Sequence, residues 1–177
     1  MLNSCTARVV AMSLATTIAG CLSPVPSSQL ESASPEMRPE VFFLGTTESR
    51  GELTHRGRSP RFLRVVSEGR QESNGGFRLD QTFTYDDGAI DRRTWRIRAI
   101  DARTYAGTIS DASGDLYGQV EGNVFHLRYR LRQPLVYVEQ WLYLQSDERT
   151  VVNLGEVTVF GIPWARLEER IVRSEGN

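Results

Sequence analysis

The stretch GGFRLDQTFTYDDGAIDRRTWRIRAI, residues 75–100, decides the fold class of this chain. Apolar and polar residues alternate on both sides of an Asp-Asp-Gly turn at residues 86–88. In the second half Trp95, Ile97 and Ala99 share one face, while threonine and arginine side chains occupy the other. A period of two is typical of a half-buried strand, and Asp-Gly between two such runs is a strong hairpin signal. The stretch therefore predicts an antiparallel β-hairpin.

Short alternating runs of this kind follow one another from Val41 onward, and no long helical window interrupts them. We expect nine or ten strands in residues 40–177, closed into a single antiparallel barrel, because closure leaves no strand edge exposed. The segment WARLEERIV, residues 164–172, fits either a helix or a strand, and we favour a last strand that closes the barrel. The other runs are VFFLG (41–45), GELTHR (51–56), PRFLRVVSEG (60–69), TYAGTIS (104–110), DLYGQVEG (115–122), NVFHLRYRLRQ (123–133), LVYVEQWLYLQ (135–145) and VVNLGEVTVFG (151–161).

A different pattern precedes this domain. Residues 1–20 carry one basic residue and a short apolar stretch ending in Ile-Ala-Gly, which is typical of a signal peptide and too short for a permanent membrane span. Together with Cys21 they resemble the bacterial lipobox, in which the cysteine becomes the lipid-modified N-terminus. Residues 21–39, rich in Ser, Pro and Glu, are then expected to form a flexible tether. The alternative is a plain secretory signal, which would leave Cys21 as an unpaired thiol in an oxidising compartment.

Composition excludes several classes of function. The 177-residue chain has a formal net charge of −1, and its 21 basic residues are all arginine, so mechanisms that need a lysine amine are excluded. His55, His126 and one remaining cysteine are too few for a zinc site, and no nucleophile motif or phosphate-binding glycine loop occurs. We expect no metal, no cofactor and no nucleic-acid partner. By resemblance to enterobacterial sorting, Leu22 after the cysteine favours an outer membrane location facing the periplasm.

Aromatic residues form the candidate ligand-binding site. Tyr137, Trp141 and Tyr143 share one face of one predicted strand, while Trp95 and Tyr129 lie on the apolar faces of two others. Placed inward, such rings either fill a small barrel or line a cavity for one small ligand. Trp95, Tyr129, Trp141 and Tyr143 are therefore our candidate ligand-binding residues.

Two other features have a simpler interpretation than a binding site. Asp86, Asp87 and Asp91 lack the spacing of an EF-hand loop, so we expect them to hydrogen-bond the local turn rather than to bind calcium. His126 is expected to be an exposed side chain on a polar strand face.

The arginine stripes at residues 96–98 and 128–132 would form one phosphate-binding surface if their two strands were neighbours. Otherwise they are solvated outer faces paired with acids such as Asp80 and Glu139, which is the interpretation we favour. The same two carboxylates are the acid–base pair that an enzyme would need, but nothing in the sequence brings them together.

Several fragments together resemble a proteobacterial lipoprotein family known as domain of unknown function 3833. The resemblance spans residues 43–171, and this chain departs from the family pattern at Gln140, Leu154 and Val159, where relatives carry charged residues. If those charges form a polar site in relatives, the site is reduced here. The fragments are LDQTFTYDDGAIDRRTWRI (79–97), TYAGTISDASGDLYGQVEGNVFHLRYRL (104–131), EQWLYL (139–144) and VFGI (159–162), with Tyr85, Asp87-Gly88, Arg93, Trp95, Tyr105, Gly107, Asp111, Gly114, Gly118 and Gly122-Asn123 as the most specific positions.

The resemblance implies an envelope lipoprotein with a β-barrel-like domain and provides no catalytic residues. Our leading hypothesis is a non-enzymatic lipoprotein with a lipocalin-like (calycin-type) barrel, held by Cys21, that binds a small lipophilic or amphipathic envelope molecule. The alternative is a structural or interaction module with a filled barrel that acts on another envelope protein. An enzyme is the third hypothesis. Whether the barrel interior is hollow or full separates the first two.

Overall fold

The computed structural model describes residues 27–174 and contains ten strands and one short helix. The predicted lipid-anchor residue, Cys21, and the predicted signal peptide lie outside the described residues. The elements are α1 (Pro39–Phe42), β1 (Gly45–His55), β2 (Arg61–Gln71), β3 (Phe77–Tyr85), β4 (Ile90–Ala99), β5 (Thr104–Ile109), β6 (Leu116–Glu121), β7 (Val124–Arg130), β8 (Val136–Leu144), β9 (Thr150–Val159) and β10 (Ile162–Arg173).

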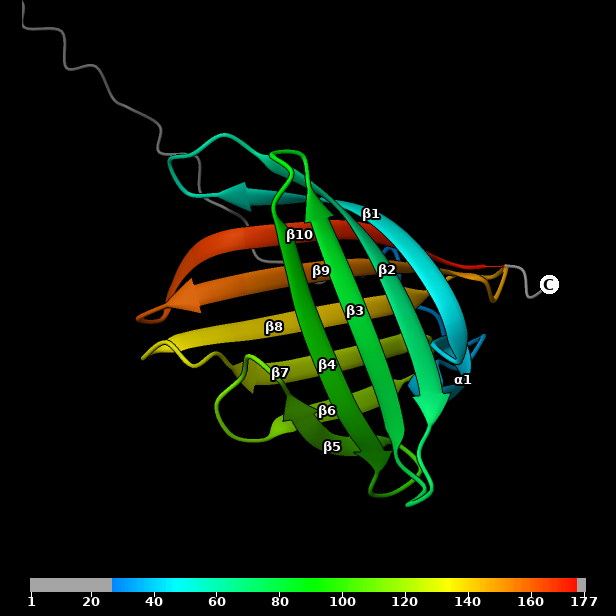
Figure 1. Ribbon diagram of the computed structural model, residues 1–177. Coiled ribbons are helices and arrows are strands. Elements are labelled where there is room, and N and C mark those ends of the chain that lie inside the picture. Colours follow the sequence, from blue (N-terminus) through cyan, green and yellow to red (C-terminus); the bar gives the residue numbers. More distant parts are fainter. Residues whose placement is uncertain (1–26, 175–177) are drawn as a thin grey trace, which may run out of the picture.

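The ten strands form one closed antiparallel barrel in which every strand pairs with its neighbours in sequence (Figure 1). The last strand, β10, pairs with β9 on one side and with β1 on the other, from Thr47↔Arg173 to His55↔Ala165. This confirms the predicted closure by residues 164–172. Closure pairs the two strands that would otherwise be exposed edges.

The hairpin predicted from residues 75–100 is formed by β3 and β4. Its turn is closed by a hydrogen bond from the Tyr85 amide to the Ala89 carbonyl at 3.0 Å. Gly88 has a φ of 82°, a conformation that glycine adopts without steric strain. Asp87 helps to hold the turn, since its carboxylate accepts from the Ala89 amide at 2.9 Å and pairs with Arg61 at 2.7 Å.

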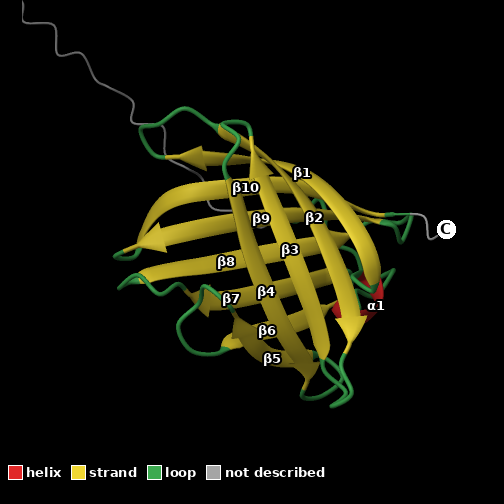
Figure 2. Ribbon diagram, in the orientation of Figure 1, coloured by secondary structure: helices red, strands yellow, loops and turns green. Residues whose placement is uncertain are grey.

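The run VFFLG was expected to be the first strand, and this is wrong. Pro39 begins the short helix α1 instead, in a position where its missing amide hydrogen is not needed. Phe42 and Phe43 are both buried, which neighbouring residues of a half-buried strand cannot be. As Figures 1 and 2 show, α1 lies at one end of the barrel, and we call this the closed end; the opposite end is the far end.

Residues 27–38, which we call the strap, run over the outer face of the barrel and lead into α1. They belong to residues 21–39, the segment predicted to form a flexible tether. Asn123, in the β6–β7 turn, holds the strap through three hydrogen bonds with Leu30 and Ser32 at 2.7–2.9 Å. The Met37 amide donates to the Gly122 carbonyl at 2.8 Å, and the Met37 side chain is fully buried.

The core is a single cluster inside the barrel. Inward-facing residues of β3 to β10 pack with Met37, Phe42 and Phe43 from the closed end, so that strap and helix complete the core. None of the helices among residues 27–174 is both long and apolar enough to cross a membrane.

Candidate functional site

The interior of the barrel changes from apolar to polar along its axis. Beside α1 it is lined by aromatic and aliphatic side chains, namely Phe43, Phe77, Ile97, Phe125, Leu142 and Ile171. Further along, polar side chains from six strands occupy inward positions. We call this set the polar belt; it consists of Ser49, Ser67, Gln81, Gln140, Asn153 and Glu169.

Glu169 on β10 is the ionisable residue of the polar belt, and only 9% of it is exposed. Its carboxyl accepts a short hydrogen bond from the Ser49 hydroxyl and a second from the Asn153 amide at 2.8 Å. Burial raises the pKa of Glu169, although the two hydrogen bonds and the charge of Arg93 act in the opposite direction. The carboxyl can therefore either donate or accept a hydrogen bond inside the barrel, depending on pH.

A glycine lies directly opposite Glu169 on the neighbouring strand. Gly51 on β1 pairs with Glu169, and a Cβ atom there would lie 2.9 Å from the Glu168 carbonyl oxygen and 3.0 Å from the Glu169 Cβ atom. Both distances are shorter than normal contacts. Gly51 therefore lets β1 and β10 approach where the barrel closes.

Two hydrogen-bond chains connect the belt to the predicted aromatic residues. The Trp95 indole donates to the Gln81 amide oxygen at 2.5 Å, and the Gln81 amide nitrogen donates to the Ser67 hydroxyl at 3.1 Å. On the other side, the Tyr129 hydroxyl donates to the Gln140 amide oxygen at 3.5 Å. The Trp95 and Tyr129 rings pack edge to face, with centroids 5.5 Å apart.

Arg93 lies beside the belt toward the far end. Its guanidinium donates to the Tyr129 hydroxyl at 3.3 Å and to the Asp111 carboxylate at 2.7 and 3.0 Å. The same cation lies 5.3 Å from the centroid of the Phe83 ring. Desolvation raises the pKa of the Tyr129 hydroxyl, while the charge of Arg93 opposes this rise. The site thus contains a half-buried cation and a buried carboxyl that do not form a direct ion pair.

A cavity of about 60 Å³ remains between the apolar end and the polar belt. It is lined by Trp95, Gln140, Asn153 and Glu169 together with the apolar residues near α1. One water molecule needs about 10–15 Å³ measured in this way, whereas sites for drug-sized ligands measure about 300–1,000 Å³. With α1 in place, the cavity therefore accommodates only a few atoms.

The predicted ligand residues are divided between the two faces of the barrel wall. Trp95 and Tyr129 point inward, as expected. The prediction that Tyr137, Trp141 and Tyr143 face inward is wrong. The inward residues of β8 are Val138, Gln140, Leu142 and Leu144.

The outward aromatic residues of β8 have other partners. The Trp141 ring stacks on His126 of β7, with centroids 5.0 Å apart, and both line an outer groove of about 670 Å³ between the strap and the barrel. His126 is half-exposed and its Nε2 atom lies 2.7 Å from Glu139. Tyr143 is buried, and its hydroxyl accepts from the Ser27 amide of the strap at 3.2 Å.

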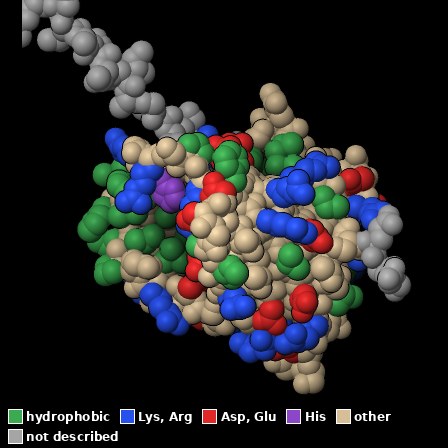
Figure 3. All heavy atoms as spheres, turned by 45° about the horizontal axis from the view of Figure 1, so that its top comes forward, with side chains coloured by type: hydrophobic (Ala, Val, Ile, Leu, Met, Phe, Trp, Pro, Cys, Tyr) green, Lys and Arg blue, Asp and Glu red, His purple; other side chains and the backbone are tan. Residues whose placement is uncertain are grey.

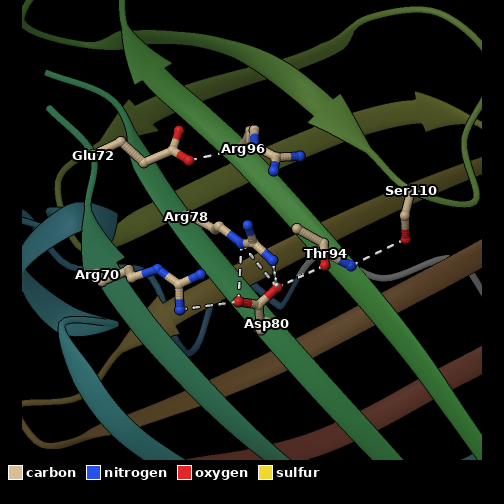
Figure 4. A network of polar contacts seen from close by, with 7 residues as sticks. All are labelled: Arg70, Glu72, Arg78, Asp80, Thr94, Arg96 and Ser110. Atoms are coloured by element: carbon tan, nitrogen blue, oxygen red, sulfur yellow. Dashed lines mark hydrogen bonds and ion pairs between the residues drawn. The ribbon is translucent and has the colours of Figure 1, made fainter. Parts of the chain in front are cut away.

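The arginine stripes do not merge into one basic surface. Strand β4, with the first stripe, is separated from β7, with the second, by β5 and β6. Figure 4 shows that Arg96 pairs with Glu72, at 3.4 Å. On β7, Arg128 pairs with Glu139 at 3.3 Å.

Asp80 is at the centre of the network in Figure 4, where it contacts Arg78 at 2.9 Å, Arg70 at 3.3 Å and the Thr94 hydroxyl at 2.6 Å. The hydrogen bond from Arg78 is the main reason that the pKa of Asp80 is lowered. Asp80 on β3 and Glu139 on β8 lie on strands that are not neighbours. The two carboxylates are therefore not brought together as an acid–base pair.

Most residues of the polar belt were not predicted from the sequence. Gln81, Asn153 and Glu169 are polar residues at inward positions of otherwise apolar strand faces, as in Leu167, Glu169 and Ile171 of β10. This pattern indicates hydrogen bonds inside the barrel, because a polar residue on a buried strand face needs a partner there. The sequence does not identify these partners, because the pairing of side chains across the barrel depends on the strand register of the closed sheet.

Comparisons with known proteins place this geometry in context. The family model described as "Protein of unknown function (DUF3833)" matches residues 15–172. No curated protein matches the chain in sequence.

Solved structures show that the fold is lipocalin-like. The S-type phycobiliprotein lyase CPES from Guillardia theta is similar, with a TM-score of 0.62 and 10% identity over 80% of this chain and 95% of that one. Rv2717c from M. tuberculosis has a TM-score of 0.60 and 14% identity over 78% and 99% of the two chains. A Nostoc punctiforme protein of the DUF3598 family has a TM-score of 0.59 and 12% identity over 80% of this chain and 51% of that one. At such identities the likeness concerns the fold alone.

Proposed function

The chain belongs to the DUF3833 family, described as proteins of unknown function, and from the geometry of its barrel we propose that it binds a small amphipathic molecule in the barrel interior. The observation that carries the proposal is the internal cavity, which has aromatic walls at one end and the polar belt at the other. An apolar chain would lie among Phe77, Ile97 and Phe125. A polar group of the ligand would reach Gln140, Asn153 or Glu169.

Access to the cavity would be at the closed end. Pro39 and Phe43 line the cavity there, and they belong to or adjoin the short helix α1, which is only four residues long. A ligand larger than a few atoms requires these side chains to move, because the present volume is about 60 Å³. Asn153 favours a polar ligand group, since its Oδ1 atom is buried without a hydrogen-bond partner among the described residues.

Binding can be tested with the fluorescent fatty-acid analogue 11-(dansylamino)undecanoic acid and the purified full-length chain. We expect dansyl emission to rise and shift to the blue as the probe leaves water. Leu142→Trp should weaken binding by about tenfold or more because it fills the cavity. Phe43→Ala should raise the affinity for the probe or its association rate, because it removes a side chain that covers the cavity at the closed end.

Trp141→Phe is the matched control, since it changes an aromatic residue of the same strand on the outer face. Equal binding by all variants would show that the probe binds outside the barrel. No binding by wild type or by Phe43→Ala would contradict the proposal and leave the second candidate, an interaction module with a filled barrel. The small size of the cavity is the observation that favours this second candidate.

We further propose that the protein is a non-enzymatic lipoprotein, anchored through Cys21 to the outer membrane and facing the periplasm. The lipobox-like residues before Cys21 support this proposal. Cys21→Ala should abolish incorporation of labelled palmitate and release the protein from the membrane fraction. Palmitate labelling that persists in Cys21→Ala would contradict acylation at this residue. Cys5→Ala is the control, because Cys5 would be removed with the signal peptide.

A further inference from the structure

Four large apolar side chains lie exposed together at the far end of the barrel. Phe160 and Ile162 belong to the β9–β10 hairpin and are 71% and 53% exposed, while Trp164 follows in β10 and is 43% exposed. Leu135, in the β7–β8 turn, is 45% exposed. We call these four residues the apolar rim. The Phe160 amide donates to the Leu135 carbonyl at 3.0 Å, so the two turns form one surface.

The backbone of the rim is unusual for such residues. Phe160 and Leu135 have φ values of 52° and 58°, in the left-handed region that bulky side chains avoid. Phe160 and Gly161 form a two-residue hairpin turn, a position where Asn-Gly is the favoured sequence. A phenylalanine that is strained and also largely exposed does not serve the stability of the fold. This points to a role outside the barrel.

Arginines flank the rim. The Arg56 amide donates to the Trp164 carbonyl at 2.9 Å, which places the β1–β2 turn beside the rim. Arg56 and Arg58 in this turn are exposed and have no ion pair among the described residues, and Arg132 lies in the turn that carries Leu135. The three turns, residues 56–60, 131–135 and 160–161, contain no aspartate or glutamate. Figure 3 shows apolar side chains gathered at one end of the molecule with arginines beside them.

We propose that the apolar rim docks on the surface of an anionic lipid bilayer. Exposed aromatic and aliphatic side chains enter the boundary between headgroups and acyl chains, and arginines around them attract anionic headgroups. Although the net charge of the chain is −1, these three turns carry only positive charge. The rim makes this contact through Leu135, Phe160, Ile162 and Trp164, and the contact does not depend on acylation of Cys21.

The test uses the full-length chain with Cys21→Ala and vesicles of dibrominated phosphatidylcholine with one third phosphatidylglycerol. Bromine atoms on the acyl chains quench only nearby indoles. We expect quenching of tryptophan fluorescence that disappears in Trp164→Phe, because Trp95 is buried and Trp141 lies on the side of the barrel. Phe160→Asn should weaken vesicle binding by about tenfold, and Arg56→Gln with Arg58→Gln by about fivefold for each arginine.

Phe160→Asn also separates docking from folding, because asparagine adopts a positive φ more readily than phenylalanine does. We expect its midpoint of urea unfolding to be equal to or higher than that of wild type while vesicle binding falls. Tyr117→Asn, at a site 63% exposed on β6, is the matched control and should bind vesicles like wild type.

Quenching that is equal in wild type and Phe160→Asn, or that persists in Trp164→Phe, would overturn the proposal. So would sedimentation that shows a dimer of the full-length chain abolished by Phe160→Asn, since the rim would then bind a second copy.

Discussion

Glu169 lies at a position where strand alternation requires an inward side chain, and the barrel accommodates it with specific partners. Ser49 and Asn153 both donate to its carboxyl, and Gly51 lets the neighbouring strand approach the Glu169 Cβ atom closely. A buried carboxyl without such donors would be strongly destabilising. Glu169 lies in an otherwise apolar strand face, which is consistent with a role in holding the polar end of a ligand.

The pH dependence of stability tests the environment of Glu169. In the unfolded chain the carboxyl loses its proton near the ordinary pKa of 4.5, while burial raises the pKa of Glu169 in the folded chain. Its contribution to stability is therefore full below pH 4.5 and is lost as the pH rises through the folded pKa. Glu169→Gln should gain in free energy of unfolding, relative to wild type, as the pH rises from about 4 to about 7.

Urea denaturation at each pH measures this difference. Glu168→Gln is the matched control, because it removes an exposed carboxyl from the adjacent position of β10. A difference between Glu169→Gln and wild type that does not change with pH would show that the carboxyl titrates alike in the folded and unfolded chains.

At the scale of elements, the strap leads into α1, whose residues line the cavity at the closed end. Asn123 in the β6–β7 turn is buried and bonds the backbone of Leu30, Ser32 and Leu144. The adjacent Gly122 has a φ of 55°, and a Cβ atom there would lie 2.3 Å from the Ser32 carbonyl oxygen. Gly122 and Asn123 therefore serve two purposes: they form the β6–β7 turn, and they allow the strap to pack against it.

Asn123→Ala should destabilise the protein by about 2–3 kcal/mol, because it leaves buried backbone groups of the strap without partners. Hydrogen exchange of the Ser32 and Met37 amides should accelerate together. Asn74→Ala is the control, since that side chain bonds only the nearby Gly76 amide, and it should cost less than about 1 kcal/mol. Unchanged protection of the strap in Asn123→Ala would contradict the role assigned to this side chain.

At the scale of the whole molecule, closure through β10 holds the fold together. This strand pairs with both β9 and β1 and places Ala165, Leu167 and Ile171 in the interior. Without it, β1 and β9 become unpaired edges and one side of the core meets water. The barrel is therefore expected to fold as one cooperative unit.

A chain ending at Phe160 should lose its cooperative unfolding transition and its near-ultraviolet circular dichroism. A chain ending at Ser174 is the control, because it keeps every described pair of β10, and its stability should stay within about 0.5 kcal/mol of wild type. A cooperative transition in the shorter chain would show that nine strands suffice.

The sequence alone determined the class of fold, because alternation with a period of two and turns such as Asp86-Asp87-Gly88 are local properties of the chain. It also indicated the closing strand over residues 164–172. Only the tertiary structure decided which aromatic residues face inward. Trp141 is the same residue type as Trp95 and Tyr143 is also aromatic, yet the register of the closed barrel places Gln140 and Leu142 on the inner face of β8.

The polar belt and the strap belong to the tertiary structure for the same physical reason. Ser49, Asn153 and Glu169 come from three strands, and Asn123 meets Leu30 across 93 residues of sequence. Contacts between distant segments depend on closure and register, which no short window of sequence contains. Local alternation therefore predicts that a barrel forms, and only the closed barrel decides what lies inside it.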